Sequence, residues 1–147
     1  MSDTLTLTQR IGQAENALRA VLDRLLAETG TTFVQWATLN MIARGGSAVQ
    51  QEQLVRQISG ALKLDEPTVL ATLGELTTLG LVTMPPGDPA RIELTTAGDA
   101  QFHSLRQRID RVTERLHGDL PMDDLAATHR MLGIVTERAN VELGRQS

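Results

Sequence analysis

The side chains that could recognise another molecule gather between residues 48 and 94, and most of them donate or accept hydrogen bonds. Gln50, Gln51, Lys63 and Arg91 offer amide or cationic groups that can contact the phosphate oxygens of DNA, and Arg56 lies among them. Phosphate contacts position a protein on a duplex but carry no sequence information. We therefore expect these residues to anchor the chain, with base recognition left to others.

A second set of side chains lies on the expected outward face of a helix that begins at Asp65. This face comprises Thr68, Ala71, Thr72, Glu75 and Thr78. The hydroxyl groups of Thr68 and Thr72 can contact base edges, and Glu75 can accept a hydrogen bond from the amino group of a cytosine. The predicted DNA-reading face therefore contains polar groups but no cation.

The balance of charge in residues 48–94 limits the expected affinity for DNA. The cations are Arg56, Lys63 and Arg91, and the acidic residues are Glu52, Asp65, Glu66, Glu75, Asp88 and Glu93. The whole chain is also acidic, with a formal net charge of −4. Because DNA affinity depends on cations that neutralise phosphates, we expect weak or strongly salt-limited binding.

No group of residues in the sequence is typical of catalysis or of metal binding. His103, His117 and His129 are not spaced at i, i+3 or i+4, and the chain has no cysteine. Asp123 and Asp124 are adjacent at a predicted helix start, where the helix dipole favours acidic residues. The sequence has no nucleophile elbow, phosphate-binding loop, dinucleotide fingerprint or zinc-protease motif. We therefore expect no enzyme, no metal site and no cofactor.

The elements that must position the DNA-binding residues are a helix-turn-helix and a hairpin within residues 47–96. The first helix has its apolar residues at Leu54, Val55, Ile58 and Leu62, and the second has them at Val69, Leu73 and Leu76. The second helix begins at Asp65, an N-cap type, carries Pro67 in its first turn, and ends at Gly80. Short strands at 81–84 and 91–94 flank the turn-forming residues 85–89. This order of elements predicts a winged helix.

Long helices are predicted on both sides of this winged segment. They run from Thr8 to about Ala27, over 33–44 after Thr31 and Thr32, over 97–118, and from Pro121 onward, with residues 1–7 loose. The last helix carries two apolar stripes, of which only one can pack on its own chain. A homodimer with intertwined termini would cover the second stripe, and the alternative is a compact monomeric bundle.

We therefore expect a mainly α fold, a winged helix-turn-helix with long N- and C-terminal dimerisation helices and a short two- or three-stranded β wing. Residues 1–147 form a single domain, in which 8–44 and 97–144 are the helical dimerisation part and 47–96 are the head. No apolar run reaches the roughly 18 residues needed to cross a bilayer, and the N-terminus has no signal peptide. We expect a cytoplasmic protein without a membrane partner.

Short motifs in the winged segment resemble those of the MarR family of bacterial transcriptional regulators. They are Gln51 and Leu54, Thr68-Val69, Leu76, Gly80-Leu81-Val82, Asp88 and Arg91, and the run Leu94-Thr95-Thr96-Ala97-Gly98. The last run resembles the family's L-T-x-x-G entry to the fifth helix. The resemblance implies a homodimer on pseudo-palindromic double-stranded DNA, with the fourth helix in the major groove and the wing on the minor groove. It also implies a response to a small, often aromatic or phenolic effector.

Two aromatic residues, Phe33 and Trp36, lie one helical turn apart in the second predicted helix. They could form one wall of a ligand pocket, and the resemblance adds Arg10, Phe102 and His103 as its neighbours. The alternative for each aromatic residue is simple packing in the core.

Two functional hypotheses follow. The first is a ligand-responsive, dimeric DNA-binding regulator, for instance a repressor. The alternative is a winged-helix dimer that no longer reads DNA and instead binds a protein or a small molecule, which the cation-free face of the fourth helix favours.

Overall fold

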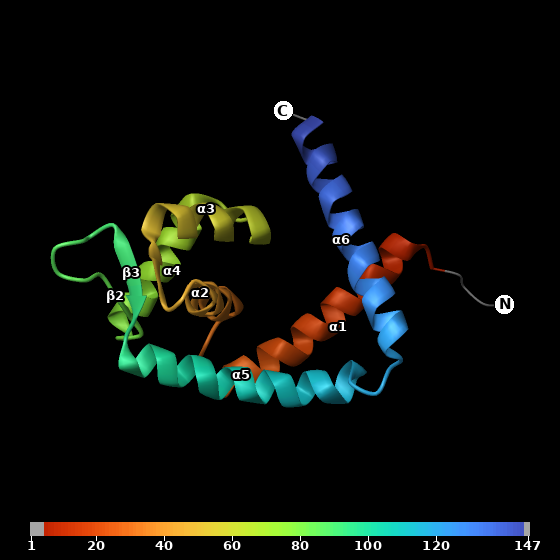
Figure 1. Cartoon of the computed structure of the whole chain (residues 1–147), viewed down its shortest axis with the longest axis horizontal. Coiled ribbons are helices and arrows are strands. Elements are labelled where there is room, and N and C mark those ends of the chain that lie inside the picture. Colours follow the sequence, from red (N-terminus) through yellow and green to blue (C-terminus); the bar gives the residue numbers. More distant parts are fainter. Residues whose placement is uncertain (1–4, 146–147) are drawn as a thin grey trace. The chain divides into compact units, whose positions relative to one another are not determined.

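The computed structural model describes residues 5–145, whose helices and strands follow one another as Figure 1 shows. The helices are α1 (Leu7–Ala27), α2 (Phe33–Arg44), α3 (Gln51–Leu62), α4 (Glu66–Thr78), α5 (Thr96–His117) and α6 (Met122–Arg145). The strands are β1 (Ala48–Gln50), β2 (Val82–Thr83) and β3 (Arg91–Leu94). The predicted mainly α, winged helix-turn-helix fold is confirmed.

The chain divides into two compact units, Met1–Ile109 and Asp110–Ser147. The first unit holds α1 to α4, the sheet and the larger part of α5, whereas the second holds the end of α5 and α6. All residues of the predicted DNA-binding surface belong to the first unit.

The sheet has three antiparallel strands in the order β1-β3-β2. The predicted wing allowed a third strand without placing it. This strand is β1, which pairs with β3 so that Val49 is opposite Ile92 and Gln50 is opposite Arg91. Because side chains alternate between the faces of a strand, Val49 and Ile92 share one face and Gln50 and Arg91 share the other. Ile92 is buried and Val49 packs against the same core, so the face of Gln50 and Arg91 is the exposed one.

The first two helices begin with reciprocal capping boxes. The Thr6 hydroxyl accepts from the Gln9 N–H while the Gln9 side chain accepts from the Thr6 N–H, and Thr32 and Gln35 repeat this arrangement at α2. The prediction of Thr8 as the first cap was wrong, because a threonine two residues earlier has the glutamine partner that Thr8 lacks. Leu7 is therefore helical, and residues 1–4 of the segment predicted to be loose lie outside the described residues.

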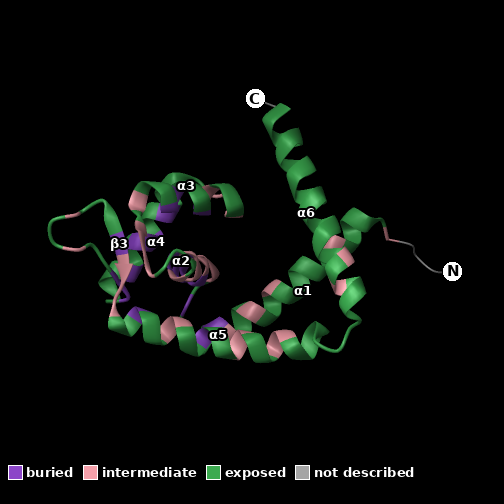
Figure 2. Ribbon diagram, in the orientation of Figure 1, coloured by how far each residue is buried: buried purple, intermediate pink, exposed green. Residues whose placement is uncertain are grey.

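The main core lies between α2, α3, α4 and the sheet. Its buried residues are Leu39, Ile42, Leu54, Val55, Ile58, Val69, Leu73, Leu76, Leu81, Val82 and Ile92. A second cluster comprises Leu26, Trp36 and Leu105, with Phe102 and Ile109 among the residues packed against it. Figure 2 shows these buried residues as purple segments, mostly on α2, α3, α4 and β3. The core fixes α3 and α4 against one another and leaves their outer sides exposed.

The start of α5 is joined closely to the end of α4 and to β2. The Thr95 N–H donates to the Leu81 carbonyl at 3.0 Å, and the Thr95 hydroxyl donates to the Gly80 carbonyl at 2.6 Å. A Cβ atom at Gly98 would overlap the Leu81 carbonyl oxygen, so only glycine permits this approach. The run from Leu94 to Gly98 therefore fixes α5 to the winged segment.

Helix α6 contains no buried residue. Seven of its large apolar side chains are 36–84% exposed, namely Met122, Met131, Leu132, Ile134, Val135, Val141 and Leu143. No helix within residues 5–145 is long and apolar enough to cross a membrane.

Candidate nucleic-acid interface

The turn between α3 and α4 is short and held by hydrogen bonds. Lys63 adopts a left-handed conformation with φ of 58°, and the Leu64 N–H donates to the Ser59 carbonyl at 3.2 Å. The Ser59 hydroxyl donates in turn to the Leu64 carbonyl. Left-handed backbone is unusual for a residue other than glycine, so these hydrogen bonds are what stabilise the turn. They set the direction in which α4 leaves α3.

Asp65 caps α4, as its residue type predicted. Its carboxylate accepts from the Thr68 N–H at 2.9 Å. The hydrogen bond from the Thr68 hydroxyl, followed by the one from the Thr68 N–H, lowers the pKa of Asp65 below its ordinary value. Asp65 is therefore ionised at neutral pH, beside the positive end of the α4 dipole.

The inward face of α4 is wider than the sequence pattern suggested. Val69, Leu73 and Leu76 are buried as predicted, and Thr72 is buried with them at 5% exposure. The Thr72 hydroxyl donates to the Thr68 carbonyl at 3.1 Å. The prediction that Thr72 faces outward was wrong, because residue 72 lies one helical turn before Leu76 on the core side. It is not available to read a base.

Most residues on the outer side of α4 were not among those that the sequence predicted for the DNA-binding face. Opposite Val69 and Leu76 lie Pro67, Leu70, Ala71, Gly74 and Thr78, all of them exposed. Among these, only Ala71 and Thr78 were predicted for the DNA-binding face. Helical periodicity counted from the buried Val69 would have placed Leu70 and Gly74 on this outer side as well. The sequence therefore contained the information needed to predict them.

Glu75 is bonded to another helix rather than projecting freely. The Gln35 side-chain N–H donates to a Glu75 carboxylate oxygen at 3.2 Å, while the other end of the Gln35 amide caps α2. One amide thus ties the start of α2 to the middle of α4. Glu75 remains exposed, but part of its capacity as an acceptor is already used.

The wing residues from Met84 to Ala90 join β2 to β3. The Arg91 guanidinium, which is the only cation of the wing, lies 3.3 Å from the Glu93 carboxylate. The Gln51 N–H donates to the Ala90 carbonyl at 2.7 Å and so joins the start of α3 to the wing. The charge of Arg91 is partly balanced before any DNA phosphate approaches.

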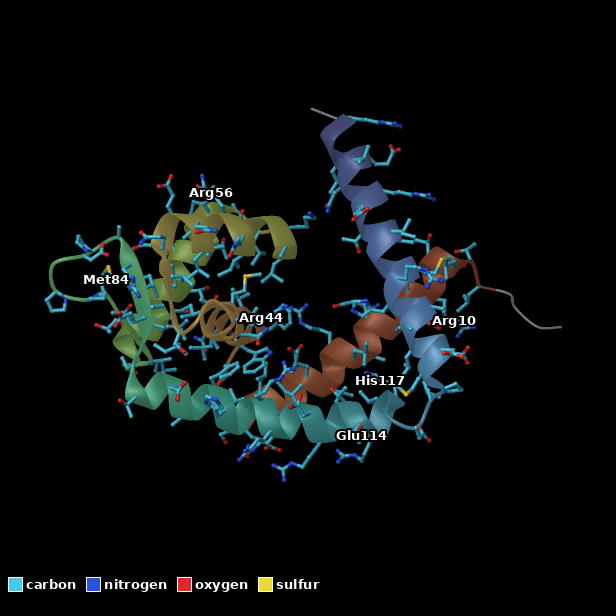
Figure 3. All side chains as sticks on the ribbon, in the orientation of Figure 1. Arg10, Arg44, Arg56, Met84, Glu114 and His117 are labelled. Atoms are coloured by element: carbon cyan, nitrogen blue, oxygen red, sulfur yellow. The ribbon has the colours of Figure 1, made fainter. Side chains whose placement is uncertain are left out.

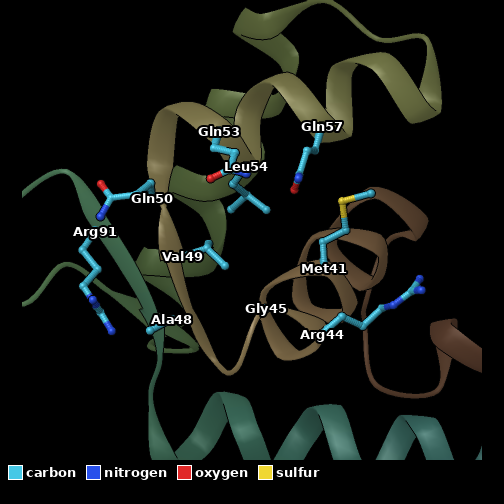
Figure 4. Close-up of a pocket in the computed structure, with 10 residues that line it drawn as sticks. All are labelled: Met41, Arg44, Gly45, Ala48, Val49, Gln50, Gln53, Leu54, Gln57 and Arg91. Carbon is cyan, nitrogen blue, oxygen red and sulfur yellow. The ribbon is translucent and has the colours of Figure 1, made fainter.

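Arg91 and Gln50 also line a hollow of about 790 Å³ between α2, β1 and α3. Figure 4 shows Gln53 and Gln57 at the upper side of the same hollow and Arg44 at its lower side, with Val49 and Leu54 also lining it. The residues that line it include two guanidinium groups and no carboxylate. The charged side chains of this concave surface are therefore both cationic.

Arg56 and Lys63, the two remaining cations of the head, lie at different places on α3. Arg56 projects from the outer side of α3 (Figure 3) and lines a second hollow of about 600 Å³ with Gln51, Glu66 and Leu70. The Lys63 ammonium donates to the Gly60 carbonyl at 2.8 Å at the opposite end of the helix. The cations are therefore spread along the head, and Glu66 lines the same hollow as Arg56.

The structure brings together three of the five residues predicted for a ligand pocket. Trp36 and Phe102 stack with ring centroids 5.5 Å apart, and His103 meets the edge of Phe102 at 5.2 Å. Trp36 is only 6% exposed and belongs to the second core cluster. For Trp36 and Phe102 the core-packing alternative accounts for these contacts, and a pocket at this place stays a prediction.

The other two predicted pocket residues make contacts elsewhere. The Arg19 guanidinium lies 3.5 Å above the ring of Phe33, and both residues line a small cavity of about 240 Å³ with Leu62 and Leu64. Arg10 donates to the Gln13 side chain on α1 at 3.2 Å. Within residues 5–145, no three His, Cys, Asp or Glu side chains are placed to hold a metal ion.

Comparison with known proteins gives a consistent assignment of the fold. No protein-family model matches the chain. Among solved structures, the reduced form of MarR from E. coli shares 21% identity, with a TM-score of 0.68 over 90% of this chain and 95% of that one. NadR in complex with 4-hydroxyphenylacetate shares 18% identity, with a TM-score of 0.75 over 92% and 98%. A MarR-family regulator from Rhodococcus sp. RHA1 shares 20% identity, with a TM-score of 0.71 over 90% and 97%. The chain therefore has the fold of MarR-family regulators along nearly its whole length.

Proposed function

We propose that this chain, which has the fold of MarR-family regulators, is a transcriptional regulator of that family that binds double-stranded DNA as a homodimer. The observation that carries the proposal is the winged helix-turn-helix itself. Helix α4 is capped at Asp65, packed on α3 by one face and exposed along the other, next to a wing that bears Arg91. Such a helix can enter a major groove while the wing contacts the neighbouring backbone. This role would place the protein in the cytoplasm, with the DNA.

The exposed apolar side chains of α6 support the homodimer. A helix with seven large apolar residues that are 36–84% exposed is unusual unless another surface covers it, and contiguous apolar patches commonly mark protein interfaces. A second copy offers the same side chains in a self-complementary arrangement. In the dimer, two α4 helices about 34 Å apart would meet successive major grooves of a pseudo-palindromic operator.

The charge of the head sets the conditions under which DNA binding can be measured. Residues 48–94 carry six carboxylates and three cations, and Arg91 is already paired with Glu93. Few phosphates can be neutralised by each head, so binding should be strongest at low ionic strength. Backbone amides and the exposed Gln50 can supply further phosphate contacts that do not depend on charge.

A direct test is a fluorescence-anisotropy titration with the DNA upstream of the protein's own coding sequence, at about 50 mM salt. A shuffled duplex of the same length and composition is the matched control. The regulator predicts tighter binding to the natural sequence than to the shuffled one. Equal affinity for both would contradict it.

We further propose that a small aromatic or phenolic molecule regulates the binding. NadR, which shares the fold, was solved with 4-hydroxyphenylacetate. The half-buried Phe102 stacks on the buried Trp36 and has His103 at its edge, so this part of the chain combines aromatic rings with an imidazole. Addition of 4-hydroxyphenylacetate to the DNA complex tests this, since a change in anisotropy is expected with the natural duplex.

A second candidate function is a winged-helix dimer that binds a protein or a small molecule instead of DNA. The acidic balance of residues 48–94 is the observation that favours it. Equal binding to the natural and shuffled duplexes, together with a stable dimer, would select this function over the first.

A further inference from the structure

The threonine hydroxyls of α4 are all used inside the protein. Those of Thr72, Thr77 and Thr78 donate to the carbonyl four residues earlier, at 3.1, 2.8 and 3.0 Å. The hydroxyl of Thr68 is hydrogen-bonded to the Asp65 carboxylate. A hydroxyl carries one proton, so a group that donates within the helix has none left for a base. The other polar side chain in the middle of α4 is Glu75, which as a carboxylate only accepts.

The side of α4 that faces away from the core is therefore mainly hydrocarbon, with the exposed Glu75 carboxylate at its edge. Leu70 is 46% exposed, and Ala71 and Thr78, which each carry one methyl group, are exposed on the same side. At Gly74, between them, a Cβ atom would meet no heavy atom within 4 Å, so the backbone itself is open to close approach. This side has no free donor of a hydrogen bond among the described residues of α4.

The chemistry of the major groove selects what such a surface can read. Guanine N7 and O6 and adenine N7 are acceptors, so their recognition needs a side chain that can donate, whereas the amino groups of cytosine and adenine need only an acceptor such as Glu75. Thymine adds a C5-methyl group, the one apolar feature of the groove, which alanine, threonine methyl and other apolar groups can contact. A donor-free, methyl-covered helix therefore matches thymine and offers nothing to the purine acceptors.

We propose that α4 recognises its operator through the methyl groups of thymines, with Leu70 and Ala71 as the contacting residues. The inference rests on the proposed DNA-binding function and specifies how that function selects a sequence. The operator half-site is accordingly rich in A·T pairs where α4 enters the groove. Phosphate anchoring by Arg56 and Arg91 contributes to affinity but not to this selection.

The experiment begins with selection of duplexes from a random pool by the full-length protein at about 50 mM salt. The enriched duplex is then resynthesised with deoxyuridine in place of each thymidine in turn, which removes one methyl group and leaves base pairing intact. At thymines under α4 we expect Kd to rise about fourfold for each methyl removed, as for the loss of one buried methyl group. Thymines outside the footprint should show no change and serve as internal controls.

Two variants connect the effect to α4. Leu70→Ala should bind the enriched duplex more weakly and should lose its sensitivity to deoxyuridine at one position. Leu79→Ala is the matched control, because Leu79 is 58% exposed but lies just beyond the last turn of α4. It should keep the full sensitivity. Thermal unfolding of both variants checks that the fold is intact.

The outcomes separate the inference from the function on which it rests. Failure to enrich any sequence would overturn the DNA-reading function, and the inference with it. Enrichment of a sequence that binds equally well with deoxyuridine would overturn the inference alone. A deoxyuridine effect that is the same in Leu70→Ala as in the parent protein would also overturn it, because the methyl groups would then be read by another element.

Discussion

Replacement of Gly74 by alanine should stabilise the fold and weaken DNA binding at the same time. Gly74 lies in the interior of α4, and an added Cβ would meet no heavy atom within 4 Å. In a helix interior alanine is more favourable than glycine by about 0.8–1.0 kcal/mol, and the open space adds no steric penalty. For a chain of this size that change raises Tm by roughly 2–4 °C.

The same methyl group would stand where α4 is expected to approach a duplex most closely. Overpacking of a close interface costs about 1–3 kcal/mol, so Kd for the enriched duplex should rise about fivefold or more. Gly60→Ala in α3 is the matched control, since a Cβ at Gly60 also meets nothing within 4 Å. This variant should gain similar stability but keep the affinity of the parent protein.

Circular dichroism at a fixed protein concentration measures Tm, and fluorescence anisotropy measures Kd. A lower Tm for Gly74→Ala beside a higher Tm for Gly60→Ala would refute the open outer side of α4. Equal duplex affinity of the two variants would refute the approach of that side to DNA.

Four further substitutions have expected outcomes. Glu75→Gln should raise the affinity for a random duplex in anisotropy titrations, because it removes a carboxylate from the reading side. The amide oxygen of the new glutamine can still accept from Gln35. A fall in affinity would instead make Glu75 a base reader. Arg91→Ala should weaken binding to all duplexes similarly and reduce the slope of log K against log salt by about 1, and an unchanged slope would show that the wing is not used. Thr32→Ala should lower the free energy of unfolding by about 1 kcal/mol in urea titrations, because it removes the capping box of α2, and full retention of stability would contradict that role. Asp65→Asn should remove a pH dependence of the free energy of unfolding. Because the pKa of Asp65 is lowered in the fold, the ionised cap stabilises the fold above the unfolded pKa of about 3.9. This contribution is lost as pH falls through the lower pKa of the folded state. Melting curves at several pH values test this last effect, and an equal acid response in both proteins would argue against it.

The elements that the sequence predicted best are those with strong local signals. Asp65, Pro67 and Gly80 mark the ends of α4 through capping and backbone preferences that act within a few residues, and the structure has them in those roles. The order of helices around the hairpin followed from apolar periodicity together with start and stop residues such as Thr31, Thr32 and Pro121. The start of α1 was misplaced by two residues because Thr6 and Thr8 are both acceptable caps, and only the partner at Gln9 distinguishes them.

The site was harder to predict, because its properties depend on contacts between distant residues. The wider buried face that takes in Thr72 depends on packing of α4 against other elements. The bond between Gln35 and Glu75 joins residues forty positions apart, and no local pattern signals it. Strand β1 has only three residues and exists because β3 pairs with it. The stacking of Trp36 on Phe102 likewise required the packing of α5 near α2.

The outer surface of α4, which has no free hydrogen-bond donor, shows why the site was harder to predict than the fold. The sequence shows four threonines in α4, which suggest hydrogen-bonding capacity toward DNA. In the structure three of these hydroxyls donate to backbone carbonyls of α4 itself, and the fourth, that of Thr68, is hydrogen-bonded to the Asp65 cap. Residue types alone therefore suggested a polar reading face, whereas the hydrogen-bond geometry indicates an apolar one.

We expect two copies of this chain to bind one duplex and to read it in a sequence-dependent way. Analytical ultracentrifugation of the protein with the duplex enriched from a random pool, beside a shuffled duplex at the same low salt, tests it most directly. We predict a complex of two chains per duplex that forms at a lower protein concentration with the enriched sequence. One chain per duplex, or the same binding to both sequences, would contradict the account.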